Sequence, residues 1–395
     1  MNNTKCINLF PEGIVRIPPS KSVLHRALIC SALSGSVLEL PAGASDDIEA
    51  TYHCVSALTR GGAATLDCAE SGSTLRFLLP IAAAKGVPAR FTGRGQLLSR
   101  PIAPLLDQLS AHGVKVSALR DELMLSGRLH SGTFELAGDI SSQYVTGLLL
   151  ALPLLEGDSE ICLHSRLESK PYVNITLDVM ARHGVLAEEY SRGYRIKGGQ
   201  RYLPHGLITE GDYSQAAFFL AAGALGRNVS VSGLSPRSKQ GDRAILDIFS
   251  RAGIGLSRDG DTVRAAAGEI SPVDVDASDI PDLIPPVAAL LAYAGGESRI
   301  YNAARLRLKE SDRLASVRAA LGALGADISE REDGLVIRGK PRLAGGSADS
   351  AGDHRIAMMT AVAAIRCDGE VLLNNPDCVR KSYPEFWKDF EVSGK

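Results

Sequence analysis

The most constraining feature of this chain is an internal repeat of helix-opening segments. Six times, a short polar or charged cluster precedes an Ala/Leu-rich helical run that closes on glycine. The marker residues of the six clusters are Lys21, Gly72, Ser141, Asp212, Asp282 and His354, at intervals of 51, 69, 71, 70 and 72 residues. A unit of this length is too long for a TPR, ankyrin or HEAT repeat. We therefore expect six similar pieces, each with two helices and several strands.

The beginnings of these helices also indicate the kind of ligand. A helix N-terminus exposes unpaired N–H groups and the positive end of the helix dipole. Ser, Lys and Arg side chains stand beside several of these N-termini, for example in segments 19–22 and 352–355. Six such helix ends favour the binding of anions.

The composition indicates that anion binding must be local. The chain has 395 residues, of which 45% are hydrophobic and 22% charged, and its net charge is −2. This is the composition of an ordinary globular protein. A chain without excess positive charge is not expected to be a general binder of nucleic acid or membrane surfaces. Its length predicts two or three domains.

The cysteines and the apolar segments predict a cytoplasmic protein. The seven cysteines are scattered without a C-x-x-C pair, which is typical of reduced thiols. The first ten residues lack the long apolar stretch of a signal peptide. The longest apolar run, 145–155, is too short to span a bilayer.

Each repeat also contains a second, more amphipathic helix, followed by β-prone stretches. These helices are expected over residues 101–109, 172–183, 241–252 and 312–324, each before a glycine. The strands expected after them include 114–116, 327–329 and 334–337. The first helices, such as 145–155 and 284–294, are apolar nearly all round, which predicts burial. An architecture with helices inside and sheets outside satisfies both patterns.

Several clusters carry more polar side chains than a helix cap requires. One serine suffices as an N-cap, yet Ser141, Ser142 and Gln143 follow one another. Ser22 and Arg26 are four residues apart and share a helix face. Each cluster alone is also compatible with an ordinary cap or a solvated charge run. Their equivalent places in the repeat indicate a shared site, and the motifs of P-loop proteins, metalloproteases, serine hydrolases and dinucleotide enzymes are absent.

Nine motifs connect the chain to a known family. In order, they are PSKSVLHRAL, ESGSTLRFL, RPIAPLLDQL, DISSQYVTGLLLALPLL, SKPYVNIT, DIPDLIPPVAA, KESDR, GDHRIAM and RKSYPEF. Together they closely resemble the EPSP synthases, or 3-phosphoshikimate 1-carboxyvinyltransferases, from about residue 13 to 390. The resemblance implies transfer of the enolpyruvyl group of phosphoenolpyruvate to the 5-hydroxyl of shikimate 3-phosphate, with release of phosphate. This reaction belongs to chorismate and aromatic amino acid biosynthesis and uses no metal or organic cofactor.

The resemblance also implies a two-domain, inside-out α/β barrel of six βαβαββ units, with helices inside and sheets outside. Residues 18–210 would form one domain, bearing most shikimate 3-phosphate contacts. Residues 1–17 and 211–395 would form the other, bearing the acid/base residues, and the active site would lie in the cleft between them. A cytoplasmic monomer is expected.

The site residues that the resemblance implies fall into three groups. Shikimate 3-phosphate would be held by Lys21, Ser22, Arg26, Ser141, Ser142, Gln143, Ser169, Tyr172, Asp282 and Lys309. Phosphoenolpyruvate would be held by Lys21, Gly72, Arg100, Gln143, Arg313, Arg355 and Lys381. The catalytic residues would be Glu310, exchanging a proton with the methylene carbon, Asp282, acting as base for the hydroxyl, and Lys21, next to the departing phosphate. The planar fork of arginine suits both carboxylate and phosphate.

Three positions depart from the family pattern. Glu70 and Phe77 replace an asparagine and a proline of the best-known members, and Arg305 stands where some members have a substrate-contacting asparagine. Gly72 indicates inhibition by glyphosate at the phosphoenolpyruvate site, because insensitive members often have alanine there. These departures bear on ligand affinity rather than on the reaction.

Two alternatives stay open at this point. The sister UDP-N-acetylglucosamine enolpyruvyl transferase shares the fold and phosphoenolpyruvate. It has Lys-Asn where this chain has Lys21-Ser22, and a reactive cysteine in the loop that corresponds to 93–100, where this chain has none. A non-catalytic repeat protein that binds anions would release no phosphate from the mixed substrates.

Overall fold

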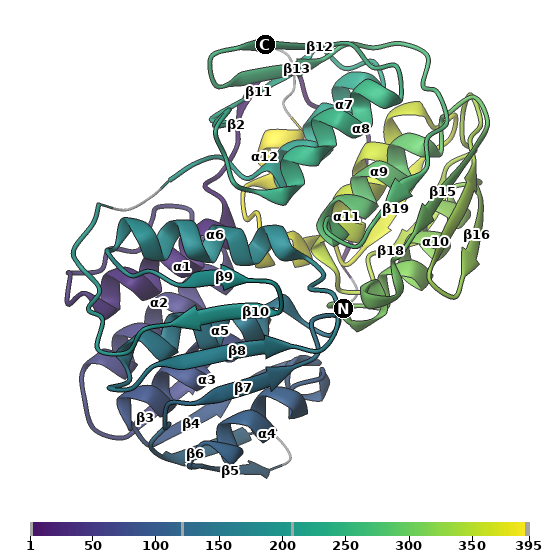
Figure 1. Cartoon of the computed structure of the whole chain (residues 1–395). Helices are drawn as coiled ribbons and strands as arrows, with labels where there is room; N and C mark the ends of the chain where they lie inside the picture. The colour runs from purple at the N-terminus through teal and green to yellow at the C-terminus, as the bar shows by residue number, and fades with distance from the viewer. Residues whose placement is uncertain (1–2, 120–121, 207–208, 392–395) are drawn as a thin grey trace. The chain divides into compact units, whose positions relative to one another are not determined.

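The computed structural model describes residues 3–119, 122–206 and 209–391, and the chain forms two compact units. Unit 1 comprises Met1–Ser20 and Glu210–Lys395, and unit 2 comprises Lys21–Thr209 (Figure 1). The chain leaves unit 1 after Ser20 and returns to it at Glu210, where the Ser20 amide donates to the Glu210 carbonyl at 2.7 Å. The sequence placed these two boundaries after residues 17 and 210.

Unit 2 contains two four-stranded sheets in the described residues. Its helices are α1 (Lys21–Leu33), α2 (Asp46–Thr59), α3 (Gly72–Lys85), α4 (Ala103–Ala111), α5 (Ser142–Ala151) and α6 (Lys170–Arg182), with the 3-10 turns η1 (Leu97–Ser99) and η2 (Leu152–Leu154). Its strands are β3 (Ala64–Asp67), β4 (Ala89–Thr92), β5 (Val114–Leu119), β6 (Glu122–Gly127), β7 (Thr133–Leu136), β8 (Ser159–Leu163), β9 (Glu188–Tyr190) and β10 (Gly193–Ile196). The strand orders are β3-β4-β6-β5 and β7-β8-β10-β9, and Figure 1 shows the second sheet as four neighbouring arrows.

Unit 1 contains three sheets in the described residues. Its helices are α7 (Tyr213–Ala224), α8 (Ile245–Arg251), α9 (Ile284–Leu291), α10 (Arg313–Ala323), α11 (His354–Ala363) and α12 (Phe386–Phe390). Its 3-10 turns are η3 (Gly241–Ala244), η4 (Pro281–Leu283), η5 (Ala304–Leu308), η6 (Ala364–Arg366) and η7 (Pro376–Lys381). Its strands are β1 (Thr4–Cys6), β2 (Gly13–Arg16), β11 (Val229–Ser232), β12 (Leu256–Asp259), β13 (Thr262–Ala265), β14 (Val275–Asp276), β15 (Glu297–Tyr301), β16 (Asp327–Arg331), β17 (Gly334–Arg338), β18 (Gly346–Asp349) and β19 (Val371–Asn374).

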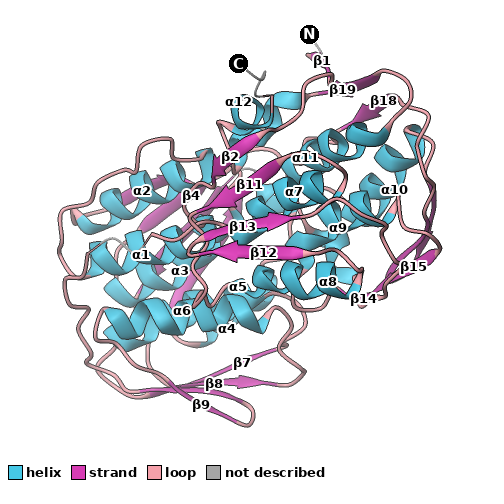
Figure 2. Ribbon diagram, turned by 90° about the horizontal axis from the view of Figure 1, so that it is seen from above, coloured by secondary structure: helices cyan, strands magenta, loops and turns pink. Residues whose placement is uncertain are grey.

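The four-stranded sheets of the two units share one pattern of pairing. In unit 1 the strand orders are β2-β11-β13-β12 (Figure 2) and β14-β15-β17-β16, with a three-stranded sheet β18-β19-β1. In every four-stranded sheet the first two strands are parallel and the remaining pairs are antiparallel. The three-stranded sheet likewise has one parallel and one antiparallel pair. The mixed α/β character predicted from the sequence is therefore confirmed.

The sequence predicted a barrel, but no sheet in the described residues is closed. In the described residues all five sheets are open, and unit 2 has two sheets rather than three. The expected unit has a strand between its two helices, but α1 is followed directly by α2. Turn-forming residues in the segment between these helices account for the difference. Gly35 and Gly43 adopt left-handed conformations (φ 79° and 70°), and Pro41 lacks a backbone donor for a ladder.

The six marker residues of the repeat all lie at helix starts, as predicted. Helices α1, α3 and α11 begin at Lys21, Gly72 and His354, Ser141 and Asp212 are the N-caps of α5 and α7, and Asp282 lies in η4, which leads directly into α9. The side chains of Ser141 and Asp212 accept hydrogen bonds from backbone N–H groups of the first turn. These bonds satisfy donors that the helix itself leaves unpaired.

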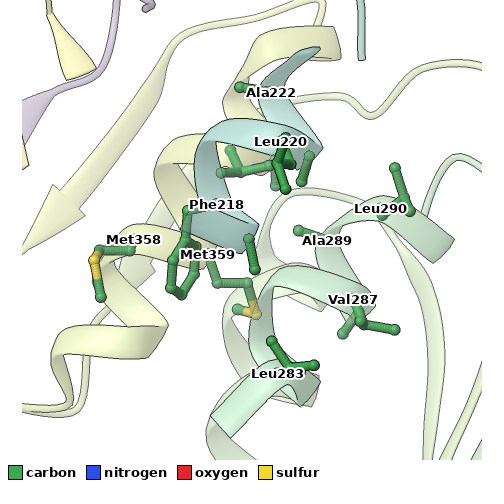
Figure 3. Close-up of a cluster of buried hydrophobic side chains, with 14 of the residues drawn as sticks. Phe218, Leu220, Ala222, Leu283, Val287, Ala289, Leu290, Met358 and Met359 are labelled. Atoms are coloured by element: carbon green, nitrogen blue, oxygen red, sulfur yellow. The ribbon is translucent and has the colours of Figure 1, made fainter. Parts of the chain in front are cut away.

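The first helices of the repeats are buried on all sides, as their apolar sequences predicted. All residues of α7 and α9 are buried. In unit 1, helices α7, α9 and α11 pack around a common core to which Phe218, Val287 and Met359 contribute (Figure 3). Because other helices and strands surround the middle of each of these helices, each helix presents its polar groups at the N-terminal turn. No helix in the described parts of the chain has both the length and the apolar character needed to cross a membrane.

Candidate active site

In unit 1 the N-terminal ends of four helices meet around two arginines. Arg355, in the first turn of α11, donates through Nη2 to the Ser214 hydroxyl of α7 and to Asp282 Oδ2, both at 3.0 Å. Its Nη1 donates to the Asp282 carbonyl at 3.1 Å. Arg313, the first residue of α10, donates to Asp282 Oδ1 at 2.8 Å. Asp282 stands just before α9, so its carboxylate joins residues that the sequence predicted to share a site.

Three carboxylates hold Arg313. Besides Asp282, it donates to Glu310 Oε2 at 2.7 Å and to Asp353 Oδ2 at 2.8 Å. The exposed fraction of the side chain is 1% for Arg313 and 0% for Asp353. A buried guanidinium requires such partners, because an unpaired charge is very unfavourable away from water. Burial alone would lower the pKa of Arg313, but Asp353, Glu310 and Asp282 outweigh burial and raise it.

Lys309 and Asp282 both have shifted pKa values. Burial lowers the pKa of Lys309 to about 8, although Asp282 Oδ1, 3.9 Å from its Nζ, favours the charged form. Burial would raise the pKa of Asp282, but Arg355, Lys309 and Arg313 together hold it well below 3.8. At pH 7 Asp282 is therefore a carboxylate, and Lys309 is mostly protonated.

In unit 2, hydrogen bonds join the starts of further helices. Lys21 Nζ, at the start of α1, lies 2.7 Å from Asp47 Oδ2 in the first turn of α2. Gln143 Nε2, in the first turn of α5, donates to the Ser73 hydroxyl in the first turn of α3 at 3.1 Å. The backbone N–H of Gln143 donates to the hydroxyl of Ser141, which is the N-cap of α5. The predicted side chains of Lys21 and Gln143 are thus each bonded to the start of another helix.

Arg26 is buried in a cage of neutral oxygens. Its guanidinium donates to the hydroxyls of Thr176 (2.7 Å) and Thr146 (3.4 Å), to the Ser22 carbonyl (2.5 Å) and to the Tyr172 carbonyl (2.9 Å). These bonds join α1 to α5 and α6. Burial lowers the pKa of Arg26 to about 9, so the group remains charged at pH 7. A cation among neutral oxygens favours the approach of an anion.

Phe77, which departs from the family pattern, packs against this cation. The Arg26 guanidinium lies 5.0 Å from the centre of the Phe77 ring, within the range of a cation–π contact. The aromatic side chain therefore contributes to the placement of Arg26. The other departure on this segment, Glu70, is exposed.

Gly72 gives two arginines close access to the start of α3. A Cβ atom at this position would lie 2.7 Å from Arg76 Nη1 and 3.1 Å from Arg100 Nη1. Arg76 also donates to the Pro101 carbonyl at 2.9 Å, and the Tyr144 hydroxyl donates to the same carbonyl at 2.6 Å. The loop that carries Arg100 is thus tied to α3 and α5. The absence of a side chain at Gly72 is what allows these guanidinium groups to approach.

A buried chain of hydroxyls lies behind these helix starts. His25 Nδ1 lies 2.7 Å from the Thr51 hydroxyl, which lies 2.6 Å from that of Thr74. The Thr74 hydroxyl donates to Ser71, the N-cap of α3, at 2.7 Å. Burial lowers the pKa of His25 to about 3, so the ring is neutral. This series of hydrogen bonds, from His25 to Ser71, holds α1, α2 and α3 together behind Lys21 and Gly72.

Ser169 adopts an unusual backbone conformation for a serine. It is the N-cap of α6 with φ at 55°, in the left-handed region, and it is buried. Such conformations are sparse outside glycine and persist where the surroundings enforce them, often at functional sites.

The predicted site residues are divided between the two units. Unit 2 contains Lys21, Ser22, Arg26, Gly72, Arg100, Ser141, Ser142, Gln143, Ser169 and Tyr172. Unit 1 contains Asp282, Lys309, Glu310, Arg313, Arg355 and Lys381. Lys381 is buried at the end of η7, which packs against α11. Within each unit, the contacts described above join many of these residues.

Sequence reasoning missed several side chains that bond to the predicted residues. Asp47, Ser73 and Ser214 each contact one of them directly. Each lies in the first turn of a helix, as do Lys21, Gln143 and Arg355, the predicted residues that they contact. A polar residue in the first turn of a helix is the signal in the sequence that marks all three.

Two further observations concern metals and thiols. No group of three or more His, Cys, Asp or Glu residues suited to a metal ion occurs in residues 3–119, 122–206 and 209–391. All seven cysteines lie within these ranges, and all are free thiols.

Comparison with solved structures defines the class of fold. An EPSP synthase from Acinetobacter baumannii superimposes with a TM-score of 0.79 at 21% identity, covering 98% of this chain and 97% of the other. The enolpyruvyl transferase NikO from Streptomyces tendae superimposes with a TM-score of 0.76 at 19% identity, covering 98% and 95%. The chain therefore has the fold of these enolpyruvyl transferases.

Sequence comparison then identifies the family. The family model described as EPSP synthase (3-phosphoshikimate 1-carboxyvinyltransferase) matches residues 59–390. The 3-phosphoshikimate 1-carboxyvinyltransferase of Clostridium kluyveri is 42% identical over 405 residues, covering 97% of this chain and 95% of that protein. The chain belongs to the EPSP synthase family.

Proposed function

We propose that this protein transfers the enolpyruvyl group of phosphoenolpyruvate to the 5-hydroxyl of shikimate 3-phosphate, giving 5-enolpyruvylshikimate 3-phosphate and phosphate. The observation that carries the proposal is the 42% identity, over 97% of the chain, to a relative named for this activity. The two clusters of cations at helix starts support it, because both substrates are strongly anionic.

The proposed active site is composite and lies in the cleft between two domains, residues 18–210 and residues 1–17 with 211–395. Neither cluster alone contains all the residues that the family pattern assigns. The finer architecture proposed is an inside-out α/β barrel of six βαβαββ units. The shared strand order of four sheets and the buried first helices support it.

We assign the ligands as the family pattern suggests. Shikimate 3-phosphate is held by Lys21, Ser22, Arg26, Ser141, Ser142, Gln143, Ser169, Tyr172, Asp282 and Lys309. Phosphoenolpyruvate is held by Lys21, Gly72, Arg100, Gln143, Arg313, Arg355 and Lys381, and glyphosate competes with it there. The helix N-termini at these residues and the neighbouring guanidinium groups of Arg313 and Arg355 support the assignment, since both kinds of group recognise phosphate and carboxylate.

The proposed reaction is an addition followed by an elimination. Glu310 gives a proton to the methylene carbon of phosphoenolpyruvate, and the 5-hydroxyl attacks the adjacent carbon while Asp282 takes its proton. The product of this step is a tetrahedral ketal that still carries phosphate. The C–O bond to phosphate then breaks next to Lys21, and the phosphate leaves with the proton that Asp282 took from the hydroxyl. A methyl proton returns to Glu310, which restores the vinyl group. Positioned acids, bases and cations of this kind each contribute substantially to such rates.

Ligand binding would also change the basicity of the acidic residues. Asp282 and Glu310 both accept hydrogen bonds from Arg313 in the described structure. An anionic substrate that takes Arg313 and Arg355 as partners competes with these carboxylates. Asp282 then regains the basicity that these arginines suppress, at the moment when a base is needed.

A test of the proposal compares acceptors. Phosphate release is measured with phosphoenolpyruvate and either shikimate 3-phosphate or UDP-N-acetylglucosamine. We expect release only with shikimate 3-phosphate. Release with the nucleotide sugar would favour the sister enolpyruvyl transferase, and no release with either acceptor would favour a non-catalytic anion-binding protein.

A further inference from the structure

The segment that carries Lys309 and Glu310 has little regular structure of its own. It connects β15 to α10 and contains only the short turn η5. A single 3-10 turn is held less firmly by its backbone than an α-helix, so side chains must fix it. Leu306 does so partly, at 1% exposure, whereas Leu308 is 45% exposed. The residue between these two leucines is Arg307.

Arg307 ties this turn to two other parts of unit 1. Its Nη1 donates to Asp312 Oδ2 at 2.9 Å and to Glu330 Oε1 at 2.6 Å. Asp312 is the N-cap of α10, and Glu330 lies on β16. The Nε atom donates to the Glu332 carbonyl at 3.2 Å, and Nη2 donates to the carbonyls of Arg331 (2.8 Å) and Glu332 (3.1 Å). Every nitrogen of the fork is used outside the candidate site.

Lys309 and Glu310 therefore lie between two fixed points. Arg307 anchors the chain on one side. On the other side, the Ser311 hydroxyl donates to the buried carboxylate of Asp353 at 3.2 Å. Only three residues, Leu308, Lys309 and Glu310, separate these anchors, so the side chains of Lys309 and Glu310 have little freedom to move away from the cluster.

We infer that Arg307 is a positioning residue, whose guanidinium fork fixes the η5 turn so that Lys309 stays beside Asp282 and Glu310 beside Arg313. The kinetic part of the inference rests on the proposed function. Lysine cannot replace this fork, because its ammonium is a single point of donation, whereas the guanidinium donates in several fixed directions. Arg307 itself would not touch either substrate.

The test uses Arg307→Met and Arg307→Lys, with Arg318→Met as the matched control. Arg318 is half-exposed on α10, and its Nε lies 3.4 Å from Glu330 Oε2, so the control removes a second arginine from the same carboxylate. We expect kcat to fall about 100-fold in Arg307→Met, since small displacements of reacting groups have effects of this size. Arg307→Lys should lie between wild type and Arg307→Met, and Arg318→Met should match wild type.

The Michaelis constant for phosphoenolpyruvate separates positioning from general structure. Arg313 keeps its bond to buried Asp353 in these variants, so this constant should change little while kcat falls. A kcat in folded Arg307→Met equal to that of Arg318→Met would overturn the inference. If Arg307→Met does not fold, Glu330→Gln is used instead, because Glu330 contacts both Arg307 and Arg318. The effect of Arg318→Met then shows how much of the Glu330→Gln effect comes from the loss of the Arg318 contact.

Amide hydrogen exchange gives a second readout that needs no activity. Residues 304–310 should exchange faster in Arg307→Met and Arg307→Lys, and at the wild-type rate in Arg318→Met. Unchanged exchange in both Arg307 variants would contradict the inference even if kcat fell. A wild-type protein without transferase activity would contradict the proposed function, while the exchange rates would still decide whether Arg307 fixes the turn.

Discussion

Asp353 and Arg313 form a buried ion pair in which Asp353 Oδ2 accepts a hydrogen bond from Arg313 Nε at 2.8 Å. The other oxygen of the same carboxylate accepts from the Arg355 amide at 2.9 Å and caps α11. One side chain therefore orients both of the arginines that we assign to phosphoenolpyruvate. The buried carboxylate links the stability of unit 1 to the geometry of its candidate site.

Asp353→Asn should weaken both stability and phosphoenolpyruvate binding. Asparagine can still cap α11 but brings no charge to Arg313. We expect the free energy of unfolding to fall by about 2 kcal/mol, the typical size of a hydrogen bond to a charged group. The Michaelis constant for phosphoenolpyruvate should rise at the same time. Denaturant unfolding and steady-state kinetics measure the two effects.

The control for Asp353→Asn is Asp178→Asn. Asp178 accepts from Arg182 at 3.0 Å on the surface of α6. Such a pair contributes about 0.3–0.5 kcal/mol, so stability and kinetics should hardly change. Equal losses in the two variants would contradict the role given to Asp353.

Gly72→Ala should discriminate against glyphosate. The added methyl would lie 2.7 Å from Arg76 Nη1 and 3.1 Å from Arg100 Nη1, so these groups must shift. We expect the inhibition constant of glyphosate to rise more than the Michaelis constant for phosphoenolpyruvate, by a factor of about ten or more, as for other one-methyl differences. Inhibition kinetics against phosphoenolpyruvate measure both constants.

Gly322→Ala provides the control for Gly72→Ala. Gly322 lies in α10, and a Cβ atom there would meet nothing within 4 Å. The kinetic constants should stay at wild-type values. An equal rise of the two constants in Gly72→Ala would refute the steric argument.

Lys309→Arg should move the alkaline limb of the pH profile. Burial lowers the pKa of Lys309 to about 8, so the free enzyme loses this positive charge as the pH rises through that value. Because shikimate 3-phosphate is anionic, its kcat/KM should fall above pH 8 in the wild type. Arginine stays protonated, so the fall should shift to higher pH. Lys340→Arg, at an exposed lysine, should keep the wild-type profile, and an unshifted limb in Lys309→Arg would count against the assignment.

His25→Asn should change the pH dependence of stability. The pKa of His25 is about 3 in the folded protein, where burial lowers it from 6.5, while Asp47 opposes the shift and Lys21 and Arg26 reinforce it. Below pH 6.5 the unfolded chain therefore binds a proton that the folded chain does not. This part of the stability is present at pH 7 and falls as the pH drops, by about 3 kcal/mol at pH 4.

Urea unfolding at pH 7 and pH 4 tests this expectation. The loss of stability between the two pH values should be smaller in His25→Asn than in wild type. The exposed His53, also in unit 2, supplies the control variant His53→Asn, which should show the wild-type loss. Equal losses in wild type and His25→Asn would show that buried His25 does not account for the effect.

The helix starts were predictable because their signals are local. Ser141 and Asp212 bond to amides two or three residues ahead, so both partners of each cap lie within one short segment. Apolar runs such as that of α9 likewise predict burial without knowledge of the neighbours. The position of the six marker residues at helix starts followed from these patterns.

The side-chain partners were not predictable, because they join residues far apart in the chain. Arg26 bonds to Thr146 and Thr176, 120 and 150 residues later, and Arg355 bonds to Ser214, 141 residues earlier. A periodic pattern shows which face of a helix is apolar but not which helix covers it. Six helix starts of similar sequence make many pairings equivalent at the level of sequence. Arg307 was missed for the same reason, since its partners other than Asp312 lie on β16 and in the turn after it, 23 to 25 residues later.

The most direct test of the proposed reaction follows all its products at once. The protein is incubated with phosphoenolpyruvate and shikimate 3-phosphate in D₂O, and phosphorus and proton NMR spectra are recorded. We expect one inorganic phosphate for each new vinyl ether, with deuterium in the vinyl methylene, because the methylene carbon is protonated and then deprotonated. Glu310→Ala should slow both signals about 100-fold, the order expected for loss of a proton carrier. Phosphate release without shikimate 3-phosphate, or a product whose vinyl group contains no deuterium, would contradict the account.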